Sequence, residues 1–172
     1  MKAVIISGAL AQDHEFIYPY YRVMEAGFDL DVCIIGGKPV LGILGTTLPP
    51  NKNHKVKDIN EIKPENYDLL ILPGGVKSME KIRQEKKLIK FISDFHKLNK
   101  VIACICSATQ LLISAKIVKG KKISGYYSME DDINNAGAIY TDEPAVVDGK
   151  IITTAHYKDM APWMEATLSF FK

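Results

Sequence analysis

The sequence has few cysteines and almost no net charge. Its 172 residues include three cysteines, Cys33, Cys104 and Cys106. This number is too small, and it is odd, so it does not suit the paired disulfide framework of a secreted domain. We therefore expect a cytoplasmic protein whose thiols are reduced. A formal net charge of +2, with no basic stripe interleaved with aromatic residues, argues against nucleic acid as a partner.

Long apolar runs and several common ligand-binding motifs are also missing. No apolar segment approaches the length of a membrane span, so we expect no interaction with a membrane. The sequence has no C-x-x-C redox motif, no histidine or cysteine cluster at the spacing of zinc ligands, and no phosphate-binding loop. We therefore expect neither a metal nor an organic cofactor.

What the chain does contain is an alternation of strand and helix patterns. Apolar runs predict buried strands at 2–7, 29–36, 67–75 and 100–105. Helix patterns are found at 15–26, 84–98, 107–115 and 160–171. An Asp148-Gly149 turn within 145–154 predicts a C-terminal hairpin. This order predicts one α/β domain over residues 1–172, a doubly wound and mostly parallel sheet with helices on both faces.

In such folds ligands bind beyond the carboxyl ends of the strands, here just after residues 7, 36, 72 and 105. Cys106 lies at the last of these points, between the small residues Cys104 and Ala108, which resembles the geometry of a G-x-S-x-G nucleophile elbow. A helix N-terminus favours the thiolate, although an inert buried cysteine stays an equal alternative. The spacing of two would put Cys104 on the same strand face, where we expect it to be a core residue.

Two further features fall on this rim. The glycines of Pro73-Gly74-Gly75 can point N–H groups into the site and, with the Ser107 N–H, hold an oxyanion; an ordinary tight turn is the alternative. Glu15 begins the first predicted helix, and a carboxyl group beside a thiol in an apolar site has a raised pKa. It is then able to stay protonated and shuttle a proton. The alternative is an acidic residue that simply stabilises a helix N-terminus.

Over nearly its whole length the chain resembles the ThiJ/PfpI family, of the class I glutamine-amidotransferase-like fold. The blocks that carry the resemblance are "EFIYPYYRVMEAGFDLDV" (15–32), "YDLLILPGG" (67–75), "CSATQLLISAKIVKGKKIS" (106–124), "DDINNAGAIYTDE" (131–143) and "VVDGKIITT" (146–154). The resemblance implies a flavodoxin-like sandwich that forms a homodimer or hexamer. It also implies Cys106 as nucleophile, Glu15 as its carboxylic partner, and the backbone N–H groups of Gly75 and Ser107 as the oxyanion site.

Both family histidines are replaced. Ser107 stands where the PfpI-type peptidase motif has a histidine directly after the cysteine, and Tyr126 stands where the parkinsonism-associated deglycase branch has one twenty positions later. His14, on the rim, and His156, after the strand "IITTA", are candidates to approach Cys106, from the same or a neighbouring subunit. For each of them, a solvated loop histidine is the alternative.

Three functions compete at this point. The first is an enzyme of glyoxalase or deglycase type, in which Cys106 adds to a small electrophilic carbonyl such as methylglyoxal, without a cofactor. The second is a non-enzymatic oxidative-stress thiol sensor or chaperone, in which Cys106 is oxidised. The third is an intracellular PfpI-type cysteine peptidase, against which the missing adjacent histidine counts. The family's isocyanide-hydrating branch works without a catalytic histidine, so Ser107 is compatible with chemistry.

Overall fold

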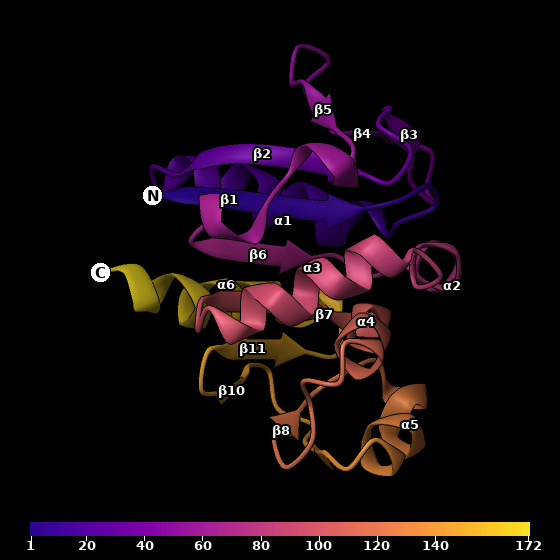
Figure 1. Ribbon diagram of the computed structural model, residues 1–172, viewed down its shortest axis with the longest axis vertical. Coiled ribbons are helices and arrows are strands. Elements are labelled where there is room, and N and C mark those ends of the chain that lie inside the picture. Colours follow the sequence, from indigo (N-terminus) through magenta and orange to yellow (C-terminus); the bar gives the residue numbers. More distant parts are fainter.

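The computed structural model describes all 172 residues and has a seven-stranded sheet at its centre (Figure 1). The strand order is β10-β11-β7-β6-β1-β2-β5, and every neighbouring pair is parallel except β10 and β11. The strands of this sheet are β1 (Lys2–Ser7), β2 (Asp29–Ile34), β5 (Val56–Lys57), β6 (Leu69–Leu72), β7 (Val101–Ile105), β10 (Val146–Asp148) and β11 (Ile151–Thr154).

Six α-helices and two small two-stranded sheets complete the fold. The small sheets pair β3 (Val40–Leu41) with β4 (Thr47–Leu48) and β8 (Lys122–Ile123) with β9 (Ile139–Tyr140). The helices are α1 (Asp13–Glu25), α2 (Val76–Ile82), α3 (Lys86–Lys97), α4 (Thr109–Ser114), α5 (Glu130–Asn135) and α6 (Met160–Leu168). No helix combines the length and the apolar character that crossing a membrane requires.

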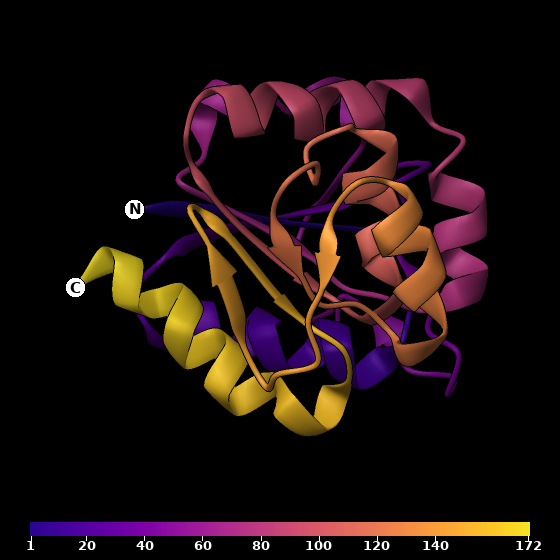
Figure 2. The same ribbon diagram turned by 90° about the horizontal axis from the view of Figure 1, so that it is seen from below.

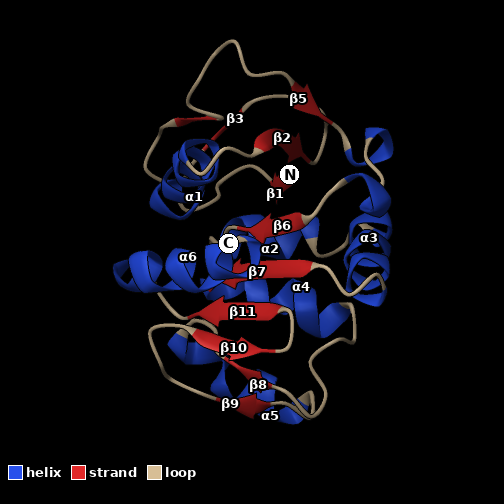
Figure 3. Ribbon diagram, turned by 90° about the vertical axis from the view of Figure 1, so that its left-hand side faces the viewer, coloured by secondary structure: helices blue, strands red, loops and turns tan.

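Helices cover both faces of the central sheet. In Figures 2 and 3, α1 and α6 lie on one side of the strands and α3 lies on the other. Alternate strand residues enter two separate cores: Ile5 and Ile71 pack in one, and Val4 and Leu70 pack in the other. The predicted α/β class, with its mostly parallel sheet, two helical layers and C-terminal hairpin, is confirmed.

One helix was not expected from the sequence. The helix predicted at 84–98 is present as α3 over Lys86–Lys97, and a further helix, α2, forms before it over Val76–Ile82. The side chain of Glu85 accepts the N–H of Lys87 and so caps a new helix. Because α2 follows directly after Gly75, its beginning lies at the same rim as Cys106.

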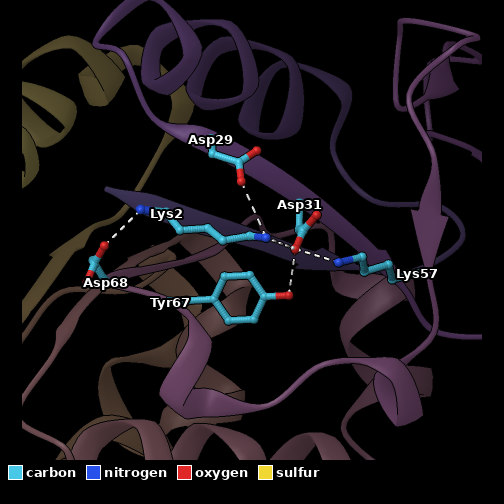
Figure 4. A network of polar contacts seen from close by, with 6 residues as sticks. All are labelled: Lys2, Asp29, Asp31, Lys57, Tyr67 and Asp68. Carbon is cyan, nitrogen blue, oxygen red and sulfur yellow. Dashed lines mark hydrogen bonds and ion pairs between the residues drawn. The ribbon is translucent and has the colours of Figure 1, made fainter.

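An ion-pair network ties together the opposite end of the sheet (Figure 4). Its centre is Asp31, whose Oδ2 accepts from Lys57 Nζ at 2.7 Å, Tyr67 Oη at 2.8 Å and Lys2 Nζ at 3.1 Å. Burial raises the pKa of Asp31, but the hydrogen bonds from Lys57, Tyr67 and Lys2 outweigh it and lower the pKa overall. The network joins β1, β2 and the two-residue edge strand β5. It lies away from the carboxyl ends of the parallel strands, where the cleft opens.

Candidate active site

A cleft of about 300 Å³ opens beyond the carboxyl ends of the parallel strands. The arrows of β1, β6 and β11 point toward this edge, on the right in Figure 1. The segments that follow β1, β6, β7 and β11 all contribute to its wall. The full lining is Gln12, Glu15, Ile43, Gly75, Val76, Cys106, Ser107, Tyr126, His156 and Tyr157. The cleft that contains Cys106 therefore lies at the position predicted for the site.

Cys106 is the first residue after β7, and its backbone turns sharply. Its φ is 61°, in the left-handed region that non-glycine residues seldom adopt. This turn moves the Cys106 side chain into the core beneath α1 and α6, while Cys104 packs in the core beneath α3 and α4. The expectation that both side chains share a strand face is therefore wrong, because Cys106 no longer belongs to the strand.

Gly74 packs directly against this turn. A Cβ atom there would lie 2.9 Å from Cys106 Cβ and 2.5 Å from Glu15 Oε2, so a side chain has no room. The Gly74 N–H donates to Glu15 Oε2 at 2.9 Å. Gly74 was expected to offer its N–H to an oxyanion, but the structure uses that group to hold Glu15 instead.

Glu15 lies in the first turn of α1, which Gln12 caps by accepting the N–H of His14. The carboxyl group of Glu15 and the Cys106 side chain both lie against Gly74, and Glu15 is 1% exposed. Burial raises the pKa of Glu15 to about 7, although the hydrogen bonds from Cys106 and Gly74 act in the opposite direction. The raised pKa expected for this carboxyl is thus confirmed, and its cause is desolvation.

The Cys106 thiol behaves differently from what its place before a helix suggested. Burial, followed by the charge of Glu15, raises its pKa to about 12, and hydrogen bonds from Ser107 only partly offset this. The helix effect is weak here because Cys106–Ala108 form a 3-10 turn and α4 has six residues. Since burial and mutual repulsion both disfavour a second charge, the pair carries at most one negative charge near neutral pH.

One of the two expected oxyanion donors is occupied in this structure. The Gly75 N–H donates to Ser107 Oγ at 3.0 Å. Gly75 has a φ of 110°, and a Cβ there would lie 2.6 Å from the backbone nitrogen of Gln12. Glycine is therefore required to bring this N–H close to the thiol.

The two candidate histidines are placed differently. His156 lines the cleft with Cys106, and its Nδ1 accepts the N–H of Lys158 at 3.2 Å. The neutral ring therefore carries its proton on Nε2, which suits a hydrogen-bond donor better than a base. His14 is exposed and lines a separate groove along α1 with Tyr18 and Met160, so the fold of one chain does not bring it to Cys106.

The remaining lining residues were not singled out from the sequence. Tyr157 follows β11, and the rule that placed Cys106 applies equally to this strand end. Ile43 and Val76 had no comparable signal, because they reach the cleft from the β3–β4 loop and from the start of α2. No three histidine, cysteine, aspartate or glutamate side chains gather as a metal-binding group.

Comparison with known proteins places this cleft in a wider context. Residues 1–169 match the model of the DJ-1/PfpI family. "Deglycase PfpI" of Pyrococcus furiosus is 31% identical over 172 residues, 100% of each chain. The "Putative cysteine protease YraA" of Bacillus subtilis is 30% identical over 162 residues, 94% of this chain and 92% of the relative.

Solved structures that resemble this fold come from the same family. A two-domain protein of Anabaena variabilis, with DJ-1/ThiJ/PfpI-like and ferritin-like domains, superimposes with a TM-score of 0.90 at 28% identity. The match covers 99% of this chain and 50% of that protein. The flavodoxin-like sandwich that the resemblance implied is thereby confirmed.

Proposed function

This chain belongs to the DJ-1/PfpI family, and we propose that it is a cysteine-nucleophile enzyme acting on small electrophilic carbonyl compounds without a cofactor. The observation that carries this proposal is the adjacency of Cys106 and Glu15, which both line the cleft and both lie against Gly74. One group supplies a nucleophile, and the other has a pKa of about 7 and so exchanges a proton at neutral pH. The reaction is of glyoxalase or deglycase type, on a 2-oxoaldehyde such as methylglyoxal.

In the first step the Cys106 sulfur attacks the aldehyde carbon while the Glu15 carboxylate accepts the thiol proton. A C–S bond forms, the C=O π bond breaks, and its electron pair moves to the aldehyde oxygen. The N–H groups of Gly75 and Ser107 stabilise this oxygen once the Ser107 hydroxyl turns away from Gly75. Glu15 then returns its proton to the oxygen, which gives a hemithioacetal.

In the second step Glu15, again ionised, removes the proton from the carbon that carries sulfur. The C–H electron pair forms a C=C bond, the C=O π pair moves to the ketone oxygen, and solvent protonates this oxygen to give an enediol. Glu15 then delivers its proton to the former carbonyl carbon, while the hydroxyl on the sulfur-bearing carbon returns a proton to solvent and becomes the new C=O. The hemithioacetal thereby becomes its isomer, the thioester of a 2-hydroxy acid, and water cleaves this thioester to release the acid and restore the Cys106 thiol. Overall, a 2-oxoaldehyde and a water molecule become a 2-hydroxy acid. Electrons balance within the substrate, so no redox partner is required.

The other two functions fit the site less well. A redox-sensor cysteine is solvent-accessible, whereas Cys106 is 9% exposed. A peptidase of the PfpI type needs a base beside its cysteine, and Ser107 has no basic nitrogen. A cleft of about 300 Å³ also lies at the lower end of the range for small-molecule sites.

The test is methylglyoxal turnover with NMR detection of lactate. We expect lactate from the wild type and from Cys33→Ala, a matched control in which a buried thiol outside the cleft is removed. We expect none from Cys106→Ala. Equal lactate formation by Cys106→Ala would overturn the proposal, whereas Cys106-dependent cleavage of an unfolded protein would favour the peptidase. Selective oxidation of Cys106 without turnover of any carbonyl compound would favour the sensor.

A further inference from the structure

Aromatic rings gather at the mouth of the cleft. Tyr126, His156 and Tyr157 line it together with Cys106, and we call these three residues the aromatic wall. The ring centroid of His156 lies 4.0 Å from that of Tyr157 and 6.4 Å from that of Tyr126. None of these rings has a part in the bond-making steps above. Their presence therefore needs a separate explanation.

The aromatic wall is held in place beside the thiol. The backbone N–H of Tyr126 donates to the carbonyl oxygen of Cys106 at 3.2 Å, so this ring follows the nucleophile turn closely. His156 caps the 3-10 turn that begins at Tyr157 by accepting the N–H of Lys158. The aromatic wall is thus built by two separate loops that the fold brings together, and each loop is held by its own hydrogen bond.

Both tyrosine rings are partly open to solvent. Tyr126 is 40% exposed and Tyr157 is 42% exposed. Ile43 and Val76 are also exposed and extend the apolar lining. The segment with Ile43 is fixed by the buried carboxylate of Asp13, which accepts the N–H groups of Leu44 and Thr46 at 2.8 and 2.9 Å. Exposed apolar surface that is held rigidly in this way is typical of a binding site.

No lysine or arginine lines the cleft. Its ionisable lining residues are Glu15, Cys106, Tyr126, His156 and Tyr157, and only His156 has a cation as its ionised form. Lys158 is the nearest cation along the chain, and its Nζ lies over the outer ring of Tyr127, 5.5 Å from the centroid. A carboxylate or phosphate on the substrate would therefore meet the negative charge of the Glu15–Cys106 pair with no lysine or arginine to balance it.

We propose that the aromatic wall is a subsite for an uncharged aromatic substituent of the substrate. The cleft then prefers aryl 2-oxoaldehydes such as phenylglyoxal over methyl or anionic analogues. This inference rests on the proposed function, because it assigns the substrate class of the same cleft. An additional stacked or edge-on aromatic contact favours the aryl compound by about three- to tenfold.

The test uses two α-chloro ketones that alkylate a thiol without turnover. In each reaction a C–S bond forms, the C–Cl bond breaks, and chloride and the thiol proton are released. Rates of Cys106 alkylation by phenacyl chloride and by chloroacetone are measured by intact mass and divided by the rates for free N-acetylcysteine at the same pH. We expect the wild type to favour phenacyl chloride by about three- to tenfold after this correction.

Variants locate the effect. Tyr157→Ala should abolish this excess, and Tyr157→Phe should keep it because the ring remains. The matched control is Tyr21→Ala, which removes an exposed tyrosine outside the cleft and should keep the excess. A corrected preference absent from the wild type, or retained in Tyr157→Ala, would overturn the proposal. So would a change of mass by light scattering in Tyr157→Ala alone, since it would assign the ring to an interface between copies.

A binding measurement separates this proposal from the proposed function. If Cys106 reacts with neither ketone, the nucleophile assignment fails, and the aromatic wall is then examined through unreactive carbonyl ligands. In an NMR titration, benzamide should bind more tightly than acetamide to the wild type and to Cys106→Ser, and this advantage should disappear in Tyr157→Ala. Equal binding of the two amides would overturn the subsite even if methylglyoxal is turned over.

Discussion

Cys104 and Cys106 are separated by one residue, yet their side chains lie in the two cores on opposite faces of the central sheet. The left-handed backbone of Cys106, with φ at 61°, produces this separation. Cys104 is fully buried, and its Sγ lies 3.9 Å from Thr109 Oγ1, so it contacts the core and not the cleft. Only one of the two thiols is therefore in a position to meet a substrate.

Cys104→Ser should consequently keep carbonyl turnover and lose stability. Burying a hydroxyl in place of the thiol costs about 1–3 kcal/mol, toward the lower end here because Thr109 offers a hydrogen-bond partner. Urea unfolding and lactate formation measure the two effects. If Cys104→Ser is as inactive as Cys106→Ser while still folded, a mechanism that uses both thiols would replace the one proposed.

Glu15→Gln should change how alkylation of Cys106 depends on pH. With Glu15 as the base, the wild-type rate rises as the carboxyl ionises, around its pKa of about 7. The amide cannot accept the thiol proton, so the variant should lack this inflection and lose about 100-fold or more in carbonyl turnover. Iodoacetamide labelling followed by mass spectrometry gives the profile. Identical profiles for the two proteins would remove Glu15 from the mechanism.

The same substitution should alter the pH dependence of stability. Because burial raises the folded-state pKa of Glu15 from 4.5 to about 7, the folded protein holds this proton more tightly than the unfolded chain. The stability contributed by the protonated Glu15, about 3 kcal/mol, is therefore fully present below about pH 4.5 and is lost as the pH rises through about 7. The free energy of unfolding of Glu15→Gln should lack this decline. Parallel curves for the two proteins in urea would contradict the assignment.

Gly74→Ala should impair activity without unfolding the protein. The added methyl group would lie 2.5 Å from Glu15 Oε2 and 2.9 Å from Cys106 Cβ, so the pair must move apart. A displacement of this size at reacting groups costs on the order of 100-fold in rate. Gly27→Ala is the control for backbone strain away from the site: its φ of 85° makes alanine strained there, but the methyl group meets nothing within 4 Å, so the variant should lose stability and keep activity. Full activity in folded Gly74→Ala would show that the pair tolerates displacement.

Asp31→Asn should destabilise the fold and leave the cleft unchanged. The substitution removes the charge that Lys2, Lys57 and Tyr67 share, at a cost of about 1–3 kcal/mol. Because hydrogen bonds lower the folded-state pKa of Asp31 below its ordinary 3.8, this stabilisation is present above that value and is lost as the pH falls further. Urea unfolding at neutral and acid pH checks both points. Equal stability at neutral pH would show that the network contributes nothing net.

The sequence by itself determined the parts of this protein that depend on local pattern. The apolar runs of β1, β6 and β7, the turn at Asp148-Gly149 and the alternation with helices follow from periodicity and turn chemistry. Cys106 and Glu15 were placed on the correct rim because parallel strands end at one edge of the sheet. The helix expected at 84–98 is present as α3, whereas the short helix α2 before it was missed.

Tertiary structure decided everything that depends on which distant groups meet. Gly74 and Glu15 are far apart in the sequence, and only the fold joins them at 2.9 Å, which turns an expected oxyanion donor into a support for the carboxyl. The raised pKa of the Cys106 thiol arises from desolvation and then from the charge of Glu15, and no local sequence pattern reports burial. Tyr126 and Tyr157 likewise come together only through loops from separate strands.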